Sequence, residues 1–350
     1  MTDCEGEFLL TIVLREKRPY EGRGVKDMVA KGKISPGEAL RNSGLPLEFA
    51  VSSILAEIDG LHPKGRYFYE REGATCETDI IAEQRVVHKS RAREVVFLHS
   101  LLFECEHRTR GKHWCFFPPA KSVKKESKNI LYTDFIPEVM GLDKSKLKPL
   151  ESGFFTNAPV VGDGTELYEG GNGQWNSNSQ AISNAIRQVT LPIGNLIPHS
   201  LLLSVSSNWG KQGYFRFFTP VIVTTSKLQV LKDGVELEEL SSFSEIESCF
   251  EERQSVFSVF ITPTYIENYW RDRIRETLKD VPRILLQKLV SNPADFGDDQ
   301  VAMSIIEDLA GWDRPTRVLI LQFDALKSEM ERYLGTFKEE LFTCFDQFES

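Results

Sequence analysis

The sequence lacks the long apolar run and the cysteine pairs that mark membrane-spanning and disulfide-stapled proteins. The apolar run at residues 8–14 is shorter than the roughly 20 residues that cross a bilayer. The residues before it are acidic, where a secretory signal is basic. The six cysteines form no C-x-x-C pair and no cluster with zinc-site spacing. We therefore expect a cytoplasmic protein with reduced thiols and no membrane association.

An excess of positive charge is also missing. The 350 residues include 42 Lys and Arg and 51 Asp and Glu, which gives a net charge of −9. Proteins that coat nucleic acid regardless of sequence are basic overall, so that class is excluded, whereas an enzyme with a local basic patch is not. The sequence also has no P-loop, no G-x-S-x-G elbow and no H-E-x-x-H helix.

After a strand predicted at residues 8–14, the sequence predicts a helix followed by three further strands. Proline is tolerated in the first turn of a helix, and the apolar residues after Pro46 recur at helical spacing. Extended segments follow at 65–71, 76–88 and 94–106. The last of these is almost continuously apolar, as expected of a central strand that is covered on both faces.

The second and third segments predict a hairpin that gathers acidic side chains. If the turn is centred just after Arg91, Asp79 lies opposite Glu104, and Glu77 lies opposite Glu106. Alternate side chains of a strand share a face, so this register brings all four carboxylates together. A slip of one residue would move them to the other face.

Such a patch is unfavourable unless a cation neutralises it. Carboxylates opposed across a sheet repel each other, and one of them tends to stay protonated. Mg²⁺ is usually held by one or two carboxylates together with water and substrate phosphate. A metal held in this way activates water for attack on the phosphate. The pattern thus predicts a Mg²⁺ or Mn²⁺ centre, with scattered acids at a solvated strand end as the alternative.

The order of these motifs resembles the PD-(D/E)xK superfamily, the restriction-endonuclease-like nucleases with an αβββαβ core. The matching stretches are residues 44–48 (G-L-P-L-E), 77–82 (E-T-D-I-I-A), 103–106 (F-E-C-E) and 112–117 (K-H-W-C-F-F). The resemblance covers roughly residues 40–230, in which a helix at 178–197 and a strand at 219–225 would complete the core. It implies an α/β fold with a mixed central sheet flanked by helices.

The resemblance also implies a metal-dependent nuclease that hydrolyses DNA phosphodiester bonds in defence against foreign DNA. Asp79 and Glu104 would be metal ligands, with the backbone carbonyl of Cys105 as a third. Glu48, on the helix, would help to hold the metal or orient water. Glu77, on the same predicted face as Asp79, is a further candidate ligand.

One position departs from the superfamily pattern, which has lysine where this chain has Glu106. Glu106 acts either as a general base or as an extra metal ligand if the site is active. In the alternative, catalysis has been lost and the chain is an inactive nuclease-fold module that binds nucleic acid or protein. A cation moved to another position, Lys112 or Lys89, is a further alternative.

A basic segment follows the predicted metal-binding strand. Residues 107–128 hold seven Lys and Arg against one Glu. Neutralising phosphates in this way gives salt-sensitive affinity that does not depend on sequence. The candidate DNA contacts are Arg108, Arg110, Lys112, Lys121, Lys124 and Lys125. The alternative is an ordinary solvated loop.

The predicted organisation has three parts. An extension at 1–43 precedes a nuclease-like domain at 44–232, which contains an insertion at 118–175. The remaining region, 233–350, is predicted to be mainly helical and is the acidic part of the chain. Its last helix, residues 323–348, carries an apolar stripe that either packs on the domain or mediates binding of a second copy or a partner protein.

Overall fold

The structure is a computed structural model that describes the chain in segments. These are residues 35–41, 43–71, 74–89, 94–108, 111–119, 132–133, 160–171, 173–206, 213–235, 246–252, 256–261, 264–279 and 316–349. The strand predicted at 8–14 and most of the insertion predicted at 118–175 lie outside them. Within these segments no helix is long and apolar enough to cross a bilayer.

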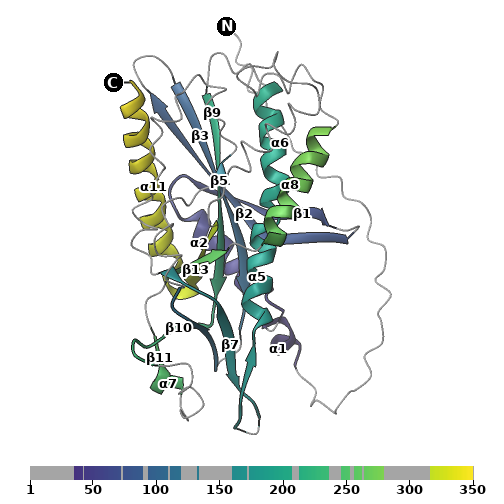
Figure 1. Ribbon diagram of the computed structural model, residues 1–350, viewed down its shortest axis with the longest axis vertical. Helices are drawn as coiled ribbons and strands as arrows, with labels where there is room; N and C mark the ends of the chain where they lie inside the picture. Colours follow the sequence, from purple (N-terminus) through teal and green to yellow (C-terminus); the bar gives the residue numbers. More distant parts are fainter. Residues whose placement is uncertain are drawn as a thin grey trace.

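Two mixed sheets and several helices form a mixed α/β architecture (Figure 1). The larger sheet has the order β1-β2-β3-β9-β13-β12-β6, and β5 pairs with β9. Its strands are β1 (Leu61–Arg71), β2 (Ala74–Lys89), β3 (Glu94–Glu106), β5 (Tyr132–Thr133), β6 (Val160–Val161), β9 (Gly213–Thr224), β12 (Val256–Ile261) and β13 (Thr316–Gln322). The strands β1, β2 and β3 form an antiparallel meander, and β9 lies parallel to β3.

Helices cover both faces of the larger sheet. The chain between the parallel strands β3 and β9 includes α5 (Gln180–Thr190) and α6 (Ile193–Ser206), which lie on one face with α8 (Thr264–Lys279). The other face is covered by α2 (Leu45–Ala56) and α11 (Leu326–Glu349), which follows the 3-10 turn η6 (Phe323–Ala325). Figure 1 shows α11 and the α6–α8 pair on opposite sides of the sheet. This double cover accounts for the continuous apolar character of β3.

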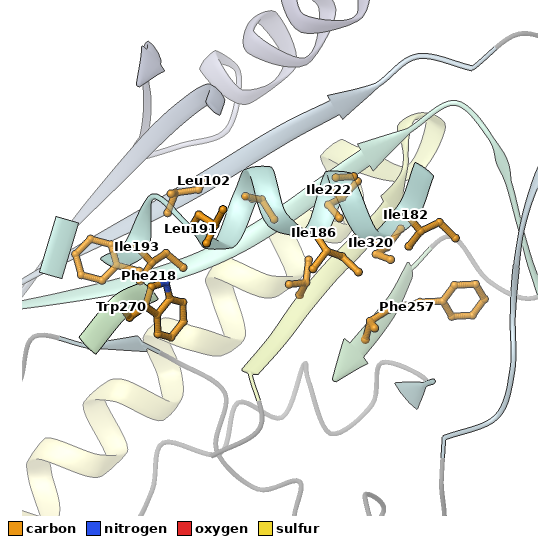
Figure 2. Close-up of a cluster of buried hydrophobic side chains, with 14 of the residues drawn as sticks. Leu102, Ile182, Ile186, Leu191, Ile193, Phe218, Ile222, Phe257, Trp270 and Ile320 are labelled. Atoms are coloured by element: carbon orange, nitrogen blue, oxygen red, sulfur yellow. The ribbon is translucent and has the colours of Figure 1, made fainter. Parts of the chain in front are cut away.

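The core under α5, α6 and α8 is shown in Figure 2, where Ile186 of α5 and Ile222 of the sheet belong to one buried cluster. Trp270 of α8 joins this cluster, and its Nε1 donates a hydrogen bond to the Thr190 carbonyl at 3.1 Å. A Cβ at Gly194 would lie 2.4 Å from Cδ1 of Trp270. Because only glycine lacks this atom, it allows α6 to approach α8 this closely.

The apolar stripe of α11 is buried within the chain. Six of its residues are at most 3% exposed: Leu326, Met330, Tyr333, Leu334, Phe337 and Leu341. The Tyr333 hydroxyl lies 2.7 Å from Oγ1 of Thr219, which lies 2.8 Å from Nε2 of the buried His99. Packing on the domain, one of the two predicted roles, is therefore confirmed for these residues. These six side chains are therefore not available to bind a second copy or a partner.

The smaller sheet has the order β11-β10-β4-β7-β8. Its strands are β4 (Lys112–Phe116), β7 (Gly164–Glu169), β8 (Trp175–Asn178), β10 (Lys227–Leu231) and β11 (Phe250–Glu252); α7 (Ile246–Cys249) precedes β11, and α1 (Pro36–Arg41) precedes α2. After short connections, β4 follows β3 and β10 follows β9. In the larger sheet β3 lies parallel to β9, and in the smaller sheet β4 lies parallel to β10. The two sheets therefore meet where β3 and β9 end.

The helix predicted after Pro46, the three strands and the strand at 219–225 are confirmed, although β1 and β9 begin earlier than predicted, at Leu61 and Gly213. The helix predicted at 178–197 is in fact two helices, because a turn at Leu191 and Pro192 separates them. Proline lacks the N–H that an uninterrupted helix needs.

Two features of the rest of the chain were not predicted. The predicted insertion at 118–175 contains β7, which pairs with β4 in the smaller sheet. The region at 233–350, predicted to be mainly helical, also supplies β12 and β13 to the larger sheet. These strands are short, and their pairing partners are distant in the sequence, so local periodicity did not identify them.

Candidate metal centre

The predicted register of the hairpin is confirmed, and it ends in a fork. The described pairs of β2 and β3 follow that register as far as Ile80 with Phe103. Beyond this point β2 continues against β1, while β3 continues against β9. Asp79 reaches across the fork, where its Oδ2 accepts a hydrogen bond from the Cys105 N–H at 2.7 Å.

A change of register between β1 and β2 accompanies the fork. Gly65 faces Ile81, but Tyr67 faces Thr78. Over this stretch β2 therefore has one residue more than β1, an arrangement that bends the longer strand and increases its twist. Asp79 lies within this bent stretch of β2, which accounts for the reach of its side chain to the backbone of β3.

Asp79 and Glu104, here named the inner pair, lie close together at the fork, where Asp79 is half-buried and Glu104 is buried. Glu104 is only 4% exposed, and within the described part of the chain its Oε2 has no hydrogen-bond partner. Burial, followed by the charges of Asp79 and Glu106, raises the pKa of Glu104 to about 10. Burial likewise raises the pKa of Asp79 to about 6, although the Cys105 N–H opposes this shift. Glu104 therefore holds a proton at neutral pH unless a cation replaces it.

The backbone of Cys105 also faces the fork. Its N–H donates to Asp79, and the N–H and C=O groups of a strand residue point to the same side. The Cys105 carbonyl is therefore directed toward β2, where it can supply an oxygen ligand. The thiol is less suitable, because burial raises its pKa well above the ordinary value and keeps it protonated.

Glu48 and Glu77, here named the outer pair, share one cation. Nη2 of Arg66 lies 2.6 Å from Oε2 of Glu48, and Nη1 lies 3.3 Å from Oε1 of Glu77. Sequence reasoning missed Arg66, which stands on β1 in a run without a motif. The prediction that Glu77 lies opposite Glu106 is wrong: β3 has already separated from β2 there, and Glu77 faces Phe68 of β1.

Glu106 and Glu166, here named the rear pair, have two cations. Glu166 of β7 is 1% exposed, and it accepts hydrogen bonds from Lys112 Nζ and Trp114 Nε1, each at 3.2 Å. Nη2 of Arg108 lies 2.7 Å from Oε2 of Glu106, and its Nε lies 2.8 Å from Oε2 of Glu166. The Nε contact lacks the geometry of a hydrogen bond, so it is an electrostatic contact.

These contacts alter the predicted roles of the basic residues. Arg108 and Lys112 neutralise buried acids rather than forming an open basic surface. The four other candidate DNA contacts, Arg110, Lys121, Lys124 and Lys125, lie outside the described residues. Lys89 stands opposite Glu94 at the far end of the hairpin, so it cannot take the place of the motif lysine.

The three acid pairs thus differ in the number of cationic side chains that contact them. The outer pair has one and the rear pair has two, whereas the inner pair has no ion-pair partner in the described chain. No three His, Cys, Asp or Glu side chains of the described segments are arranged to hold a metal ion. A Mg²⁺ at the inner pair would use two carboxylates and a backbone carbonyl, with water or phosphate completing its shell. Few protein ligands and several waters are usual for this ion.

No protein-family model, no curated protein and no solved structure matches the chain. A function has therefore to be inferred from the residues at the fork of β2 and β3.

Proposed function

We propose that the chain is a nuclease that hydrolyses DNA phosphodiester bonds with Mg²⁺ or Mn²⁺ bound at the inner pair. The observation that carries this proposal is the buried Glu104, one oxygen of which has no hydrogen-bond partner among the described residues, next to the half-buried Asp79 and the Cys105 carbonyl. Burying an unpaired charge is costly, and a divalent ion would remove that cost for both acids. The donors are all oxygen, which suits Mg²⁺ and Mn²⁺.

The order of the elements supports a restriction-endonuclease-like core. α2, β1, β2, β3, α5 and β9 come in the order αβββαβ, with β4 to β8 between β3 and α5, and with α6 before β9. Strand β9 is parallel to β3. The inner pair stands where the second and third strands separate, and its two residues are those to which the resemblance assigns the metal. DNA as the substrate, and a role in defence against foreign DNA, are proposed from the resemblance.

In the proposed mechanism, a bound metal would polarise the scissile phosphate and lower the pKa of a water molecule bound to the metal. The Cys105 N–H holds one oxygen of Asp79 and leaves the other for the metal. Arg108 holds one oxygen of Glu106, so the second oxygen is available to accept the proton of the attacking water or to contact the metal. The water oxygen then bonds to phosphorus as the bond to the sugar oxygen breaks, and that oxygen takes up a proton.

Cleavage of plasmid and single-stranded DNA with Mg²⁺ or Mn²⁺ tests the proposal. We expect Asp79→Asn and Glu104→Gln to lower kcat by more than about 100-fold. Substitution of residues that only hydrogen-bond to metal ligands already lowers metal affinity or activity by about 10–100-fold. Glu83→Gln is the matched control: this acid of β2 pairs with Lys64 at 2.7 Å, away from the fork, and its loss should leave activity unchanged.

A second candidate function, an inactive module with the nuclease fold, is favoured by the ion pair of Glu106 with Arg108 at the position of the motif lysine. Folded wild-type protein that binds Mn²⁺ but cuts no DNA with either metal would favour this module. Cleavage that persists in both inner-pair variants would contradict the proposed centre.

A further inference from the structure

Glu166 connects the smaller sheet to the candidate metal centre. It lies on β7 directly opposite Trp114 of β4, and Lys112 of the same strand reaches its other oxygen. These two donors already satisfy a buried carboxylate. The third contact, from Arg108, comes from the connection between the sheets, and the second acid that Arg108 touches is Glu106.

Two hydroxyl groups hold this connection in place. The Arg108 N–H donates to Thr225 Oγ1 at 2.8 Å, and the same hydroxyl donates to the Arg108 carbonyl at 3.0 Å. Thr224 Oγ1 donates to the Glu106 carbonyl at 3.2 Å. With the backbone fixed, the guanidinium of Arg108 stays between the two acids, and its charge is divided between them.

We propose that Glu166 is a positioning residue of the metal centre: it draws Arg108 and Lys112 toward the smaller sheet, which limits their hold on Glu106 and keeps Glu106 available to the metal. This inference rests on the proposed function. Without the charge of Glu166, two cations would face Glu106 alone and would repel a divalent ion at the inner pair. Such effects are strong because a buried site is less screened than a surface site.

Opposite changes in Mn²⁺ affinity distinguish this role from a structural one. Glu166→Gln keeps the shape of the side chain and an acceptor for Trp114, but it should weaken Mn²⁺ binding by on the order of tenfold. Arg108→Gln removes a positive charge and frees Glu106, so it should tighten Mn²⁺ binding by a similar factor. Loss of structure alone would weaken binding in both variants.

Calorimetric titration of the full chain with Mn²⁺ alone measures these affinities without requiring activity. Glu169→Gln, an exposed acid on the same strand, is the control and should bind Mn²⁺ like the wild type. Glu166→Asp keeps the charge and should fall between the wild type and Glu166→Gln.

The outcomes separate this inference from the proposed function. Changes in the same direction for Glu166→Gln and Arg108→Gln, or no change, would overturn the positioning role while leaving the metal centre in place. If Glu166→Gln does not fold, weaker or unchanged binding by Arg108→Gln still overturns it. Failure of the wild type to bind Mn²⁺ would overturn the proposed function together with this inference.

Discussion

The inner and rear pairs each join a buried carboxylate, Glu104 or Glu166, to a half-buried one, yet they differ in their surroundings. The rear pair is contacted by Arg108 and Lys112 and by the indole of Trp114. The inner pair receives one backbone hydrogen bond, and one of its carboxylate oxygens has no partner in the described chain. Arg108 and Lys112 thus neutralise the rear pair, whereas the inner pair has no ion-pair partner among the described residues.

This difference separates two uses of buried charge. Removing either member of a buried ion pair strongly destabilises the protein, because the remaining charge is left uncompensated. A buried acid without a cation lowers the stability of the protein until a proton or metal arrives. Substitutions that remove one charge should therefore act in opposite directions at the two pairs.

The largest stability effect is expected at the rear pair. Glu166→Gln should lower the free energy of unfolding by about 3 kcal/mol, since it leaves Arg108 and Lys112 with one acid fewer in a buried site. Urea denaturation at pH 8 in EDTA measures this change, with Glu169→Gln as the exposed control. A change below about 0.5 kcal/mol would mean that the cations find other partners.

At the inner pair a smaller effect of opposite sign is expected. Glu104→Gln should raise the free energy of unfolding of the metal-free protein at pH 8 by on the order of a few kcal/mol, because the wild-type acid must take up a proton on folding and glutamine need not. The gain should depend on pH, because the folded pKa of Glu104, about 10, lies above its ordinary value of 4.5. The contribution of wild-type Glu104 is fully present below pH 4.5 and is lost as the pH rises toward 10.

Urea denaturation from pH 5 to pH 9 in EDTA would reveal this slope, which should be shallower in Glu104→Gln than in the wild type. Mg²⁺ should restore part of the stability of the wild type and have little effect on the variant. Equal slopes in the two proteins would show that Glu104 is not buried as a protonated acid.

The smallest effect is expected at the outer pair. Arg66 is partly exposed, and surface ion pairs contribute about 0–1 kcal/mol, so Arg66→Gln should change the free energy of unfolding by no more than this. It should still tighten Mn²⁺ binding a few-fold, because the charge of Arg66 lowers the pKa of Asp79 and repels a nearby cation. Weaker Mn²⁺ binding in this variant would imply that Arg66 is needed to shape the site.

Local sequence patterns predicted the register of β2 and β3 but not the ion pairs around the acids at their ends. Apolar runs and the turn after Arg91 were sufficient for the register of β2 and β3, since alternation along strands is a local property. The same patterns carried no signal for Arg66 or Glu166, which are isolated charged residues in segments without a motif. Their roles depend on the acids that they contact across strands.

The sequence by itself determined which residues could build a centre: two adjacent strands with acids at matching positions, and a helix with an early acid before them. Only the tertiary structure decided which of these acids lack a cation. The fork of β2 and β3 separates Glu77 from Glu106, and the smaller sheet brings Glu166 to Arg108. Pairing of charges is decided by distances of a few ångströms between segments far apart in the chain, and those distances exist only once the sheets have formed.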